Sequence, residues 1–344
     1  MYESFYGLSG KPFQLNPDPS FYYGSRGHKR AFAYLEYGLY QSEGFIVITG
    51  DIGAGKTTIV RSLLEQLDAA KVVAVQLVST QLDADDMLRA VGAAFGLPVR
   101  SVDKAVLLAS LEAFLCQLAV DKKRALLVVD EAQNLPSRAV EELRMLSNFQ
   151  LGDQALLQSF LVGQPELREM MQSPEMQQLR QRVIASYHLG PLDKAETQAY
   201  IEHRLKHVGW KDDPRFEPEC FDLVYELTGG IPRRINTLCN RLLLAAFLAE
   251  KHVISTSDVQ AIAREILEEM GPESGLSAVA VVASDPPDEG HSLARVDASV
   301  WHRHFSQIEE RIDRLEATVG AAVDLLHSLL HPEKAAKPGS PGRR

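Results

Sequence analysis

A glycine-rich loop constrains what this chain can fold into more than any other part of its sequence. The loop reads Gly50-Asp51-Ile52-Gly53-Ala54-Gly55-Lys56-Thr57-Thr58. It follows an apolar run at 45–48 and opens a segment with apolar residues at helical spacing. In such a strand–loop–helix context, backbone N–H groups and the helix N-terminus face a phosphate, Lys56 reaches the β- and γ-phosphates, and Thr57 binds Mg²⁺. A glycine turn without a ligand is the alternative, but it does not account for Lys56 and Thr57 at this spacing.

Composition limits the class of protein. The 344 residues are 45% hydrophobic, which suits two compact domains or one large domain with appendages. A net charge of -10 argues against a nucleic-acid binder whose whole surface is basic, but not against a local basic patch. Cys116, Cys220 and Cys239 lack metal-ligand spacing, which favours a reducing cytoplasm. Neither a signal-peptide pattern nor a run of about 20 apolar residues is present, so we expect a cytoplasmic protein without direct membrane insertion.

The periodicity of apolar residues divides the chain into regions. Strand-like runs occur at 45–49, 72–78, 125–129, 157–162 and 184–189. Because helical stretches separate these runs, we predict an α/β core at 44–190 with a parallel sheet covered on both faces. Helical segments follow at 194–208, 216–228, 231–250 and 256–269. They predict a small helical domain at 191–270.

The two ends of the chain differ from this pattern. Residues 1–43 are rich in aromatic and turn residues, with a helix expected over 28–40. Residues 271–300 have the composition of a flexible linker. Residues 301–331 carry apolar positions at alternating spacings of three and four, which predicts a short heptad or coiled-coil helix. An amphipathic helix docked on the body is the alternative, and residues 332–344 are expected to be disordered.

Two adjacent carboxylates, Asp130 and Glu131, end the apolar run at 125–129. Successive residues at a strand end point in different directions, so these two side chains can take different roles. Asp130 is expected to hold Mg²⁺. Glu131 is expected to orient and polarise the water that attacks the γ-phosphate. With the glycine loop upstream, the pair indicates ATP hydrolysis rather than binding alone.

Three further polar positions complete the candidate site. Gln164 follows the run at 157–162, where it can sense the γ-phosphate; a solvated helix cap is the alternative. Arg182, preferred to Arg180 because it directly precedes the last apolar run, can act in the ATP site of a neighbouring subunit, where such arginines accelerate hydrolysis. A surface arginine is the alternative. Arg233 follows a Gly-Gly-Ile-Pro turn at a helix start and can contact the γ-phosphate, or can be a solvated side chain.

The order of these motifs resembles that of the AAA+ ATPases and, more narrowly, the general secretion pathway protein A (ExeA-like) family. The narrower resemblance covers about residues 1–270. It rests on Tyr6-Gly7-Leu8, Pro12-Phe13, Asn16-Pro17-Asp18-Pro19, Asp130-Glu131-Ala132-Gln133-Asn134-Leu135, Leu161-Val162-Gly163-Gln164-Pro165-Glu166-Leu167 and Gly229-Gly230-Ile231-Pro232-Arg233. Within the family, the chain is most similar to the secretion ATPase found with exopolysaccharide and PEP-CTERM/exosortase loci.

The resemblance implies a P-loop NTPase (AAA+) core, a helical lid at 191–270, and ATP and Mg²⁺ as ligands. It implies Walker A, Walker B, sensor 1, arginine-finger and sensor 2 roles for the loop at 50–58, Asp130-Glu131, Gln164, Arg182 and Arg233 respectively. It also implies that residues 1–43 pack on the nucleotide site, where Tyr22 and His28 help to enclose adenine.

The function that the resemblance implies is ATP hydrolysis by a homo-oligomer, such as a ring, that supports an envelope secretion or exopolysaccharide export system. Any contact with the inner membrane would go through partner proteins. Full-length family members continue into a membrane span and a peptidoglycan-binding part, whereas a linker and a heptad helix follow the lid here, so cell-wall binding is not expected. AAA+ proteins of transposition have a similar Asp-Glu-Ala-Gln sequence, and a DNA-associated regulator that uses ATP as an assembly switch is therefore the alternative.

Overall fold

The computed structural model describes residues 1–78, 83–100, 102–271 and 275–277. The predicted heptad helix at 301–331 and the tail at 332–344 lie outside the described residues, as does most of the predicted linker. Among the helices of the described part, none is both long enough and apolar enough to cross a membrane.

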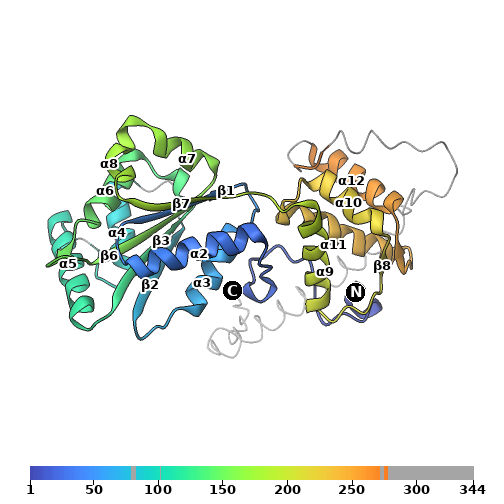
Figure 1. Cartoon of the computed structure of the whole chain (residues 1–344), viewed down its shortest axis with the longest axis horizontal. Helices are drawn as coiled ribbons and strands as arrows, with labels where there is room; N and C mark the ends of the chain where they lie inside the picture. The colour runs from blue at the N-terminus through green and yellow to red at the C-terminus, as the bar shows by residue number, and fades with distance from the viewer. Residues whose placement is uncertain (79–82, 101, 272–274, 278–344) are drawn as a thin grey trace, which may run out of the picture. The chain divides into compact units, whose positions relative to one another are not determined.

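A five-stranded parallel sheet forms the core, which confirms the α/β prediction (Figure 1). Its strands stand in the order β2-β3-β6-β1-β7. Their bounds are β1 (Phe45–Gly50), β2 (Val72–Val78), β3 (Arg124–Asp130), β6 (Leu157–Gly163) and β7 (Val183–Leu189). Neighbouring strands are parallel throughout. Strand β6 therefore lies between β1, which leads into the glycine loop, and β3, which ends in Asp130.

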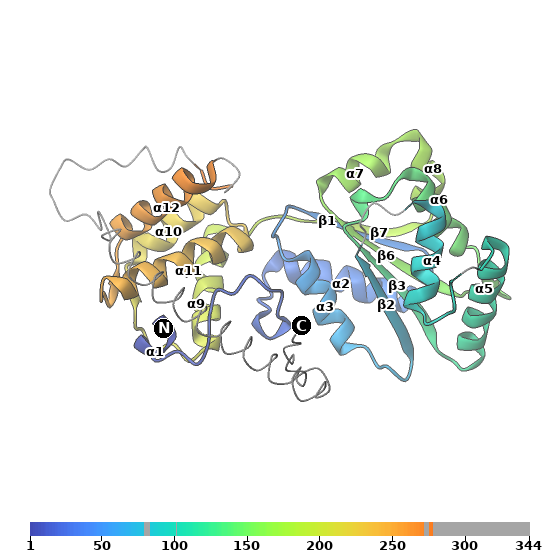
Figure 2. The same cartoon turned by 180° about the vertical axis from the view of Figure 1, so that it is seen from behind.

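Helices cover both faces of this sheet, as a parallel sheet with buried strands requires. Helices α2 (Arg26–Gln41) and α3 (Lys56–Gln66) pack on one face. The other face is covered by α4 (Ala84–Ala94), α5 (Lys104–Val120), α6 (Ser137–Leu146) and α7 (Pro165–Gln172) (Figure 2). Side chains along β1 alternate between the two faces of the sheet. Phe45 and Val47 pack against the α4–α7 side, whereas Ile46 and Ile48 pack against α2 and α3.

Short elements fill the remaining connections of the core. The strands β4 (Gln150–Leu151) and β5 (Gln154–Ala155) form an antiparallel hairpin. Helix α8 (Gln177–Arg180) precedes β7, and single 3₁₀ turns lie at Ala132–Asn134 and Pro174–Met176 in the core and at Pro19–Phe21 in the N-terminal segment.

The helical lid contains α9 (Lys194–His207), α10 (Pro218–Thr228), α11 (Pro232–Leu248) and α12 (Thr256–Met270), with the two-residue strands β8 (Arg215–Phe216) and β9 (Val253–Ile254). Its apolar cluster also takes in the start of the chain, from α1 (Tyr2–Phe5) to the fully buried Phe13. The hydroxyl of Tyr2 donates to Asn240 Oδ1 at 2.9 Å, and that of Tyr6 donates to the Lys251 carbonyl at 2.9 Å. The first residues of the chain therefore pack on the lid.

Candidate nucleotide site

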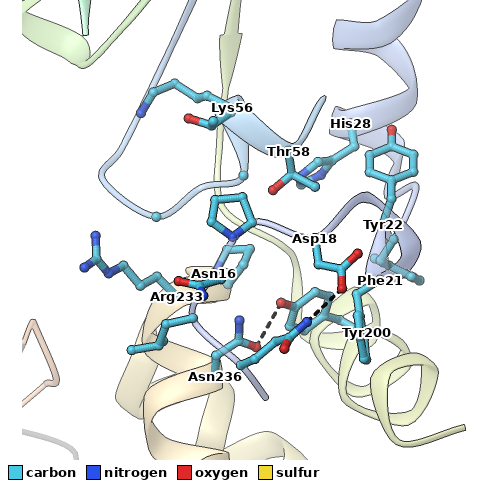
Figure 3. A pocket seen from close by; sticks show the side chains of 18 of the residues that line it. Asn16, Asp18, Phe21, Tyr22, His28, Lys56, Thr58, Tyr200, Arg233 and Asn236 are labelled. Carbon is cyan, nitrogen blue, oxygen red and sulfur yellow. Dashed lines mark hydrogen bonds between the residues drawn. The ribbon is translucent and has the colours of Figure 1, made fainter. Parts of the chain in front are cut away.

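One cavity of about 350 Å³ collects most of the predicted site residues. Its lining comes from the glycine loop, residues 14–18 and 21–23 of the N-terminal segment, His28 in the first turn of α2, the ends of β3 and β6, and the lid (Figure 3). Of the nine predicted loop residues, those that line it are Ile52, Gly53, Gly55, Lys56, Thr57 and Thr58. Glu131, Gln164 and Arg233 line it too.

The backbone of the loop depends on two glycines. Gly53 has φ +85° and Gly55 has φ +99°, values that residues with a Cβ rarely adopt. A Cβ on Gly53 would lie 2.3 Å from the Cβ of Arg233, and one on Gly55 would lie 2.7 Å from Nε2 of His28. The loop therefore needs glycine for its conformation and also for the close approach of α11 on one side and α2 on the other.

Lys56 is buried and lies back on its own loop. Its Nζ donates to the carbonyls of Gly50 at 2.7 Å and Asp51 at 2.9 Å. Burial lowers the pKa of Lys56, although the charges of Glu131 and Asp130 oppose this shift. The ammonium group is thus held against the backbone of the glycine loop, and Lys56 lines the cavity where a phosphate would bind.

Thr57 and Asp130 bring together two oxygens of the kinds that Mg²⁺ binds. The Thr57 hydroxyl donates to Asp130 Oδ2 at 2.9 Å. Asp130 is only 4% exposed, and this burial raises the pKa of its carboxyl group despite the hydrogen bond from Thr57. These residues fit a Mg²⁺ ion that completes its coordination with phosphate and water. The part of the chain that the structure describes contains no group of three or more His, Cys, Asp or Glu residues that could hold a metal alone.

Glu131 and Gln164 meet at the ends of β3 and β6. Gln164 Nε2 donates to Glu131 Oε2 at 3.1 Å, and Gln133 Nε2 donates to the same oxygen at 2.6 Å. Glu131 has φ 54°, so a residue with a Cβ occupies the left-handed region here. Burial raises the pKa of Glu131, but the two amide hydrogen bonds and the charge of Lys56 outweigh it and hold the pKa below its usual range. The Glu131 carboxylate is therefore ionised, and the two amide hydrogen bonds fix its orientation.

Arg180 and Arg182, the two candidates for the arginine finger, lie outside the cavity. Arg182 Nη1 donates to the carbonyl and hydroxyl of Ser147 at 3.1 and 3.0 Å, and its Nη2 donates to Asn148. Arg180 Nη1 donates to the carbonyls of Met171 and Ser173 at 2.5 and 2.7 Å. Neither is among the described residues that line the cavity of its own chain. A role for Arg182 in the site of a neighbouring subunit stays a prediction.

Arg233 connects the lid to the loop. Its backbone N–H donates to the Gly53 carbonyl at 3.2 Å, and its side chain lies at the cavity. Arg233 belongs to the first turn of α11, where Pro232 occupies the first helical position. The sequence motif thus corresponds to a direct contact between α11 and the phosphate-loop backbone.

His28 and Tyr22, named through the resemblance, also line the cavity. Nδ1 of His28 is 2.7 Å from Oγ of Ser25, the residue that caps α2. Burial lowers the pKa of His28 to about 4, although a hydrogen bond with the Ala54 backbone and the charge of Glu196 act in the opposite direction. His28 is therefore a neutral side chain that braces the glycine loop.

One polar side chain of the lid that lines the cavity, that of Arg204, is not predicted from the sequence. Arg204 is buried; its Nε donates to the Pro12 carbonyl at 2.6 Å and its Nη1 to the Tyr200 hydroxyl at 2.8 Å. Its guanidinium lies 4.8 Å from the ring centre of Phe21, and Tyr200 in turn donates to Asn236 Oδ1 at 2.9 Å. Arg204 gave no signal because it occupies an ordinary position in a helical segment with other charged residues.

Comparisons with known proteins agree with this geometry. The AAA domain family matches residues 39–171. General secretion pathway protein A of Aeromonas hydrophila is 40% identical over 268 residues, which are 77% of this chain and 48% of that protein. The chain thus spans about half the length of this relative.

Two solved structures share the fold. The Aeropyrum pernix ORC2 protein, solved as ADPNP-ADP complexes, has a TM-score of 0.58 and 20% identity over 75% of this chain and 72% of its own. Cdc6p of Pyrobaculum aerophilum has a TM-score of 0.56 and 17% identity over 76% and 70%. The parallel sheet, the glycine loop and the family match together show that this chain contains an AAA domain, and 77% of the chain is 40% identical to General secretion pathway protein A.

Proposed function

We propose that this chain binds ATP with Mg²⁺ and hydrolyses it to ADP and phosphate. The observation that carries the proposal is the meeting of Lys56, Thr57, Glu131 and Gln164 at one cavity, from the ends of three adjacent strands. Phosphate-binding residues and a directed carboxylate are the two components that hydrolysis needs. The ADPNP-ADP complexes of the ORC2 protein support the choice of an adenine nucleotide.

Different residues of the site bind the phosphates, hold Mg²⁺ and activate the attacking water. The loop N–H groups and the start of α3 bind phosphate oxygens, and Lys56 exchanges its two carbonyl partners for the β- and γ-phosphates. Thr57 and Asp130 hold Mg²⁺, which when bound neutralises developing phosphate charge. Glu131 accepts a proton from water as the water oxygen bonds to the γ-phosphorus and the bond to the bridging oxygen breaks. Gln164 and Arg233 stabilise the transferred phosphoryl group.

We further propose that this ATPase acts as a homo-oligomer in a bacterial envelope secretion system. Identity to General secretion pathway protein A supports the secretion role. The finer assignment is export of exopolysaccharide at a PEP-CTERM/exosortase locus, with the export machinery as partner. In this assembly Arg182 leaves Ser147 and Asn148 and reaches the neighbouring site, where it stabilises the transition state.

The catalytic assignment is tested with Glu131→Gln in the full-length purified protein. We expect ATP turnover to fall by about 10²- to 10⁴-fold, the usual contribution of a positioned general base, with ATP affinity retained. Exposed Glu175→Gln is the matched control and should keep full activity. Unchanged turnover in Glu131→Gln would refute the assignment.

The role of Arg182 is tested by mixing subunits that carry Arg182→Ala with subunits that carry Glu131→Gln. Arg182→Ala subunits keep their own Glu131, and Glu131→Gln subunits keep Arg182, so a mixed oligomer contains complete sites. We expect mixing to restore turnover above either variant alone. A mixture that shows only the sum of the two separate activities would argue against an arginine supplied by the neighbour.

The export role is tested in cells of the source organism. A chromosomal Glu131→Gln substitution should reduce extracellular polysaccharide to the level of a strain that lacks the gene. Normal polysaccharide in the Glu131→Gln strain would contradict this role without affecting the proposal of ATP hydrolysis.

A further inference from the structure

Gln133 joins the two strand ends that carry the proposed hydrolytic residues. Its Nε2 donates to Glu131 Oε2 at 2.6 Å, and its Oε1 accepts from the backbone N–H of Gln164 at 3.0 Å. Gln164 Nε2 also donates to Glu131 Oε2 at 3.1 Å, so the three residues form a closed ring of hydrogen bonds. Each polar atom of the Gln133 side chain therefore has a defined partner, and the partners directly follow two different strands.

The backbone around Gln133 is shaped for this contact. Glu131 adopts the left-handed conformation, and the 3₁₀ turn Ala132–Asn134 follows immediately. This turn brings the side chain of Gln133 back over Glu131. At the end of β6, a Cβ on Gly163 would lie 2.7 Å from Oε1 of Gln133. The absence of a side chain at Gly163 thus gives Gln133 access to the β6 backbone.

Gln133 is placed behind the cavity rather than in it. Glu131 and Gln164 line the cavity, whereas Gln133 is not among its described lining residues. Gln133 can therefore affect a bound nucleotide only through its two neighbours. A glutamine amide suits this position because it donates to a carboxylate and accepts from a backbone N–H at the same time.

We propose that Gln133 is a positioning residue, which holds the Glu131 carboxylate and the Gln164 strand end at a fixed separation for attack on the γ-phosphate. This proposal rests on the proposed ATP hydrolysis. Without Gln133, the carboxylate keeps a single amide donor and can rotate, and the Gln164 N–H loses its protein acceptor. Misplacement of a general base slows the chemical step, whereas the phosphate-binding groups of the loop stay intact.

The test compares kcat and nucleotide affinity in Gln133→Leu, which removes both hydrogen bonds at similar side-chain size. We expect kcat to fall on the order of 10- to 100-fold. The Kd for a fluorescent ATP analogue should change less than about threefold, because the loop contacts remain. The exposed Gln178→Leu is the matched control and should change neither quantity.

A second substitution covers the case in which Gln133→Leu does not fold. Gln133→Glu keeps the size and the acceptor but replaces the donor with a negative charge next to Glu131. We expect it to lower kcat at least as much as Gln133→Leu, again with affinity retained. A loss of affinity equal to the loss of kcat in either variant would show a merely structural role and overturn the proposal.

The double variant with Glu131→Gln tests whether Gln133 acts through Glu131. If it does, adding Gln133→Leu should lower the residual turnover less than about twofold, because residues that act as a unit are not additive. A further 10-fold loss would overturn the proposal. If wild type and Glu131→Gln turn over ATP equally, the proposed catalytic role of Glu131, on which this inference rests, has failed. If turnover depends on Glu131 but Gln133→Leu keeps its kcat, only the role of Gln133 is refuted.

Discussion

Replacement of His28 by glutamine tests whether a neutral, buried imidazole braces the glycine loop. His28 is only 6% exposed, between the Ser25 cap of α2 and the loop backbone at Ala54 and Gly55. Because burial lowers its pKa to about 4, the folded chain leaves His28 uncharged at pH values where the unfolded chain protonates it. Between the two pKa values the unfolded state thus binds more protons, so the free energy of unfolding rises with pH.

The size of the effect follows from the two pKa values. With a pKa of about 4 in the folded chain and about 6.5 in the unfolded chain, His28 alone removes about 2 kcal/mol of unfolding free energy between about pH 7.5 and about pH 5. The loss approaches about 3 kcal/mol below pH 4, where both states are protonated. Glutamine does not titrate, and its amide can reach toward the loop as Nε2 of histidine does.

The assay is urea unfolding of the full chain, followed by circular dichroism at both pH values. Other titrating groups contribute equally to wild type and variant, so the difference between their pH-dependent losses isolates His28. We expect His28→Gln to lose about 2 kcal/mol less than wild type on acidification. Equal losses, at equal urea dependence of the free energy, would refute the view that folding keeps His28 neutral.

Two further substitutions test the contacts of the lid at the cavity. Gly53→Ala should abolish binding of a fluorescent ATP analogue, because its Cβ would lie 2.3 Å from the Cβ of Arg233; Gly152→Ala, also at positive φ but with no atom within 4 Å, should bind normally. If both variants bind alike, the contact with Arg233 is not the cause. Arg204→Met, which removes the guanidinium bound to Tyr200, should lower the free energy of unfolding by about 3 kcal/mol in urea. An unchanged urea midpoint would contradict this.

The parts of the site that the sequence predicted are those whose position follows from the fold class alone. Apolar runs in the sequence predict where the strands lie, and the carboxyl ends of parallel strands share one edge of the sheet. The glycine loop and Gln164 each follow a strand directly and Asp130 is the last residue of one, so a parallel sheet was enough to bring them together. The hydrogen bond between Thr57 and Asp130 is the clearest result of that rule.

Residues that reach the site through side-chain length or through a turn could not be predicted in this way. Gln133 lies three residues past the end of β3, and its direction depends on the left-handed conformation of Glu131, which no pattern in the sequence indicates. Arg204 comes from the last turn of α9, and its guanidinium is held at the cavity by the Pro12 carbonyl of the N-terminal segment, which packs on the lid. Both cases require knowledge of packing between segments that are distant in sequence.

The sequence predicts the Gly-Gly-Ile-Pro-Arg motif as a helix-entry turn, and the structure adds a second physical reason for the second of its glycines, Gly230. A Cβ on Gly230 would lie 2.1 Å from the Leu192 carbonyl, and the Leu192 N–H donates to the Gly230 carbonyl at 2.9 Å. Leu192 directly precedes the capping residue of α9, so this close contact fixes where α11 begins relative to α9. The position of that first turn in turn decides whether the Arg233 N–H meets the Gly53 carbonyl. Gly230 therefore acts on the phosphate loop through the placement of α11, although it is not among the described residues that line the cavity.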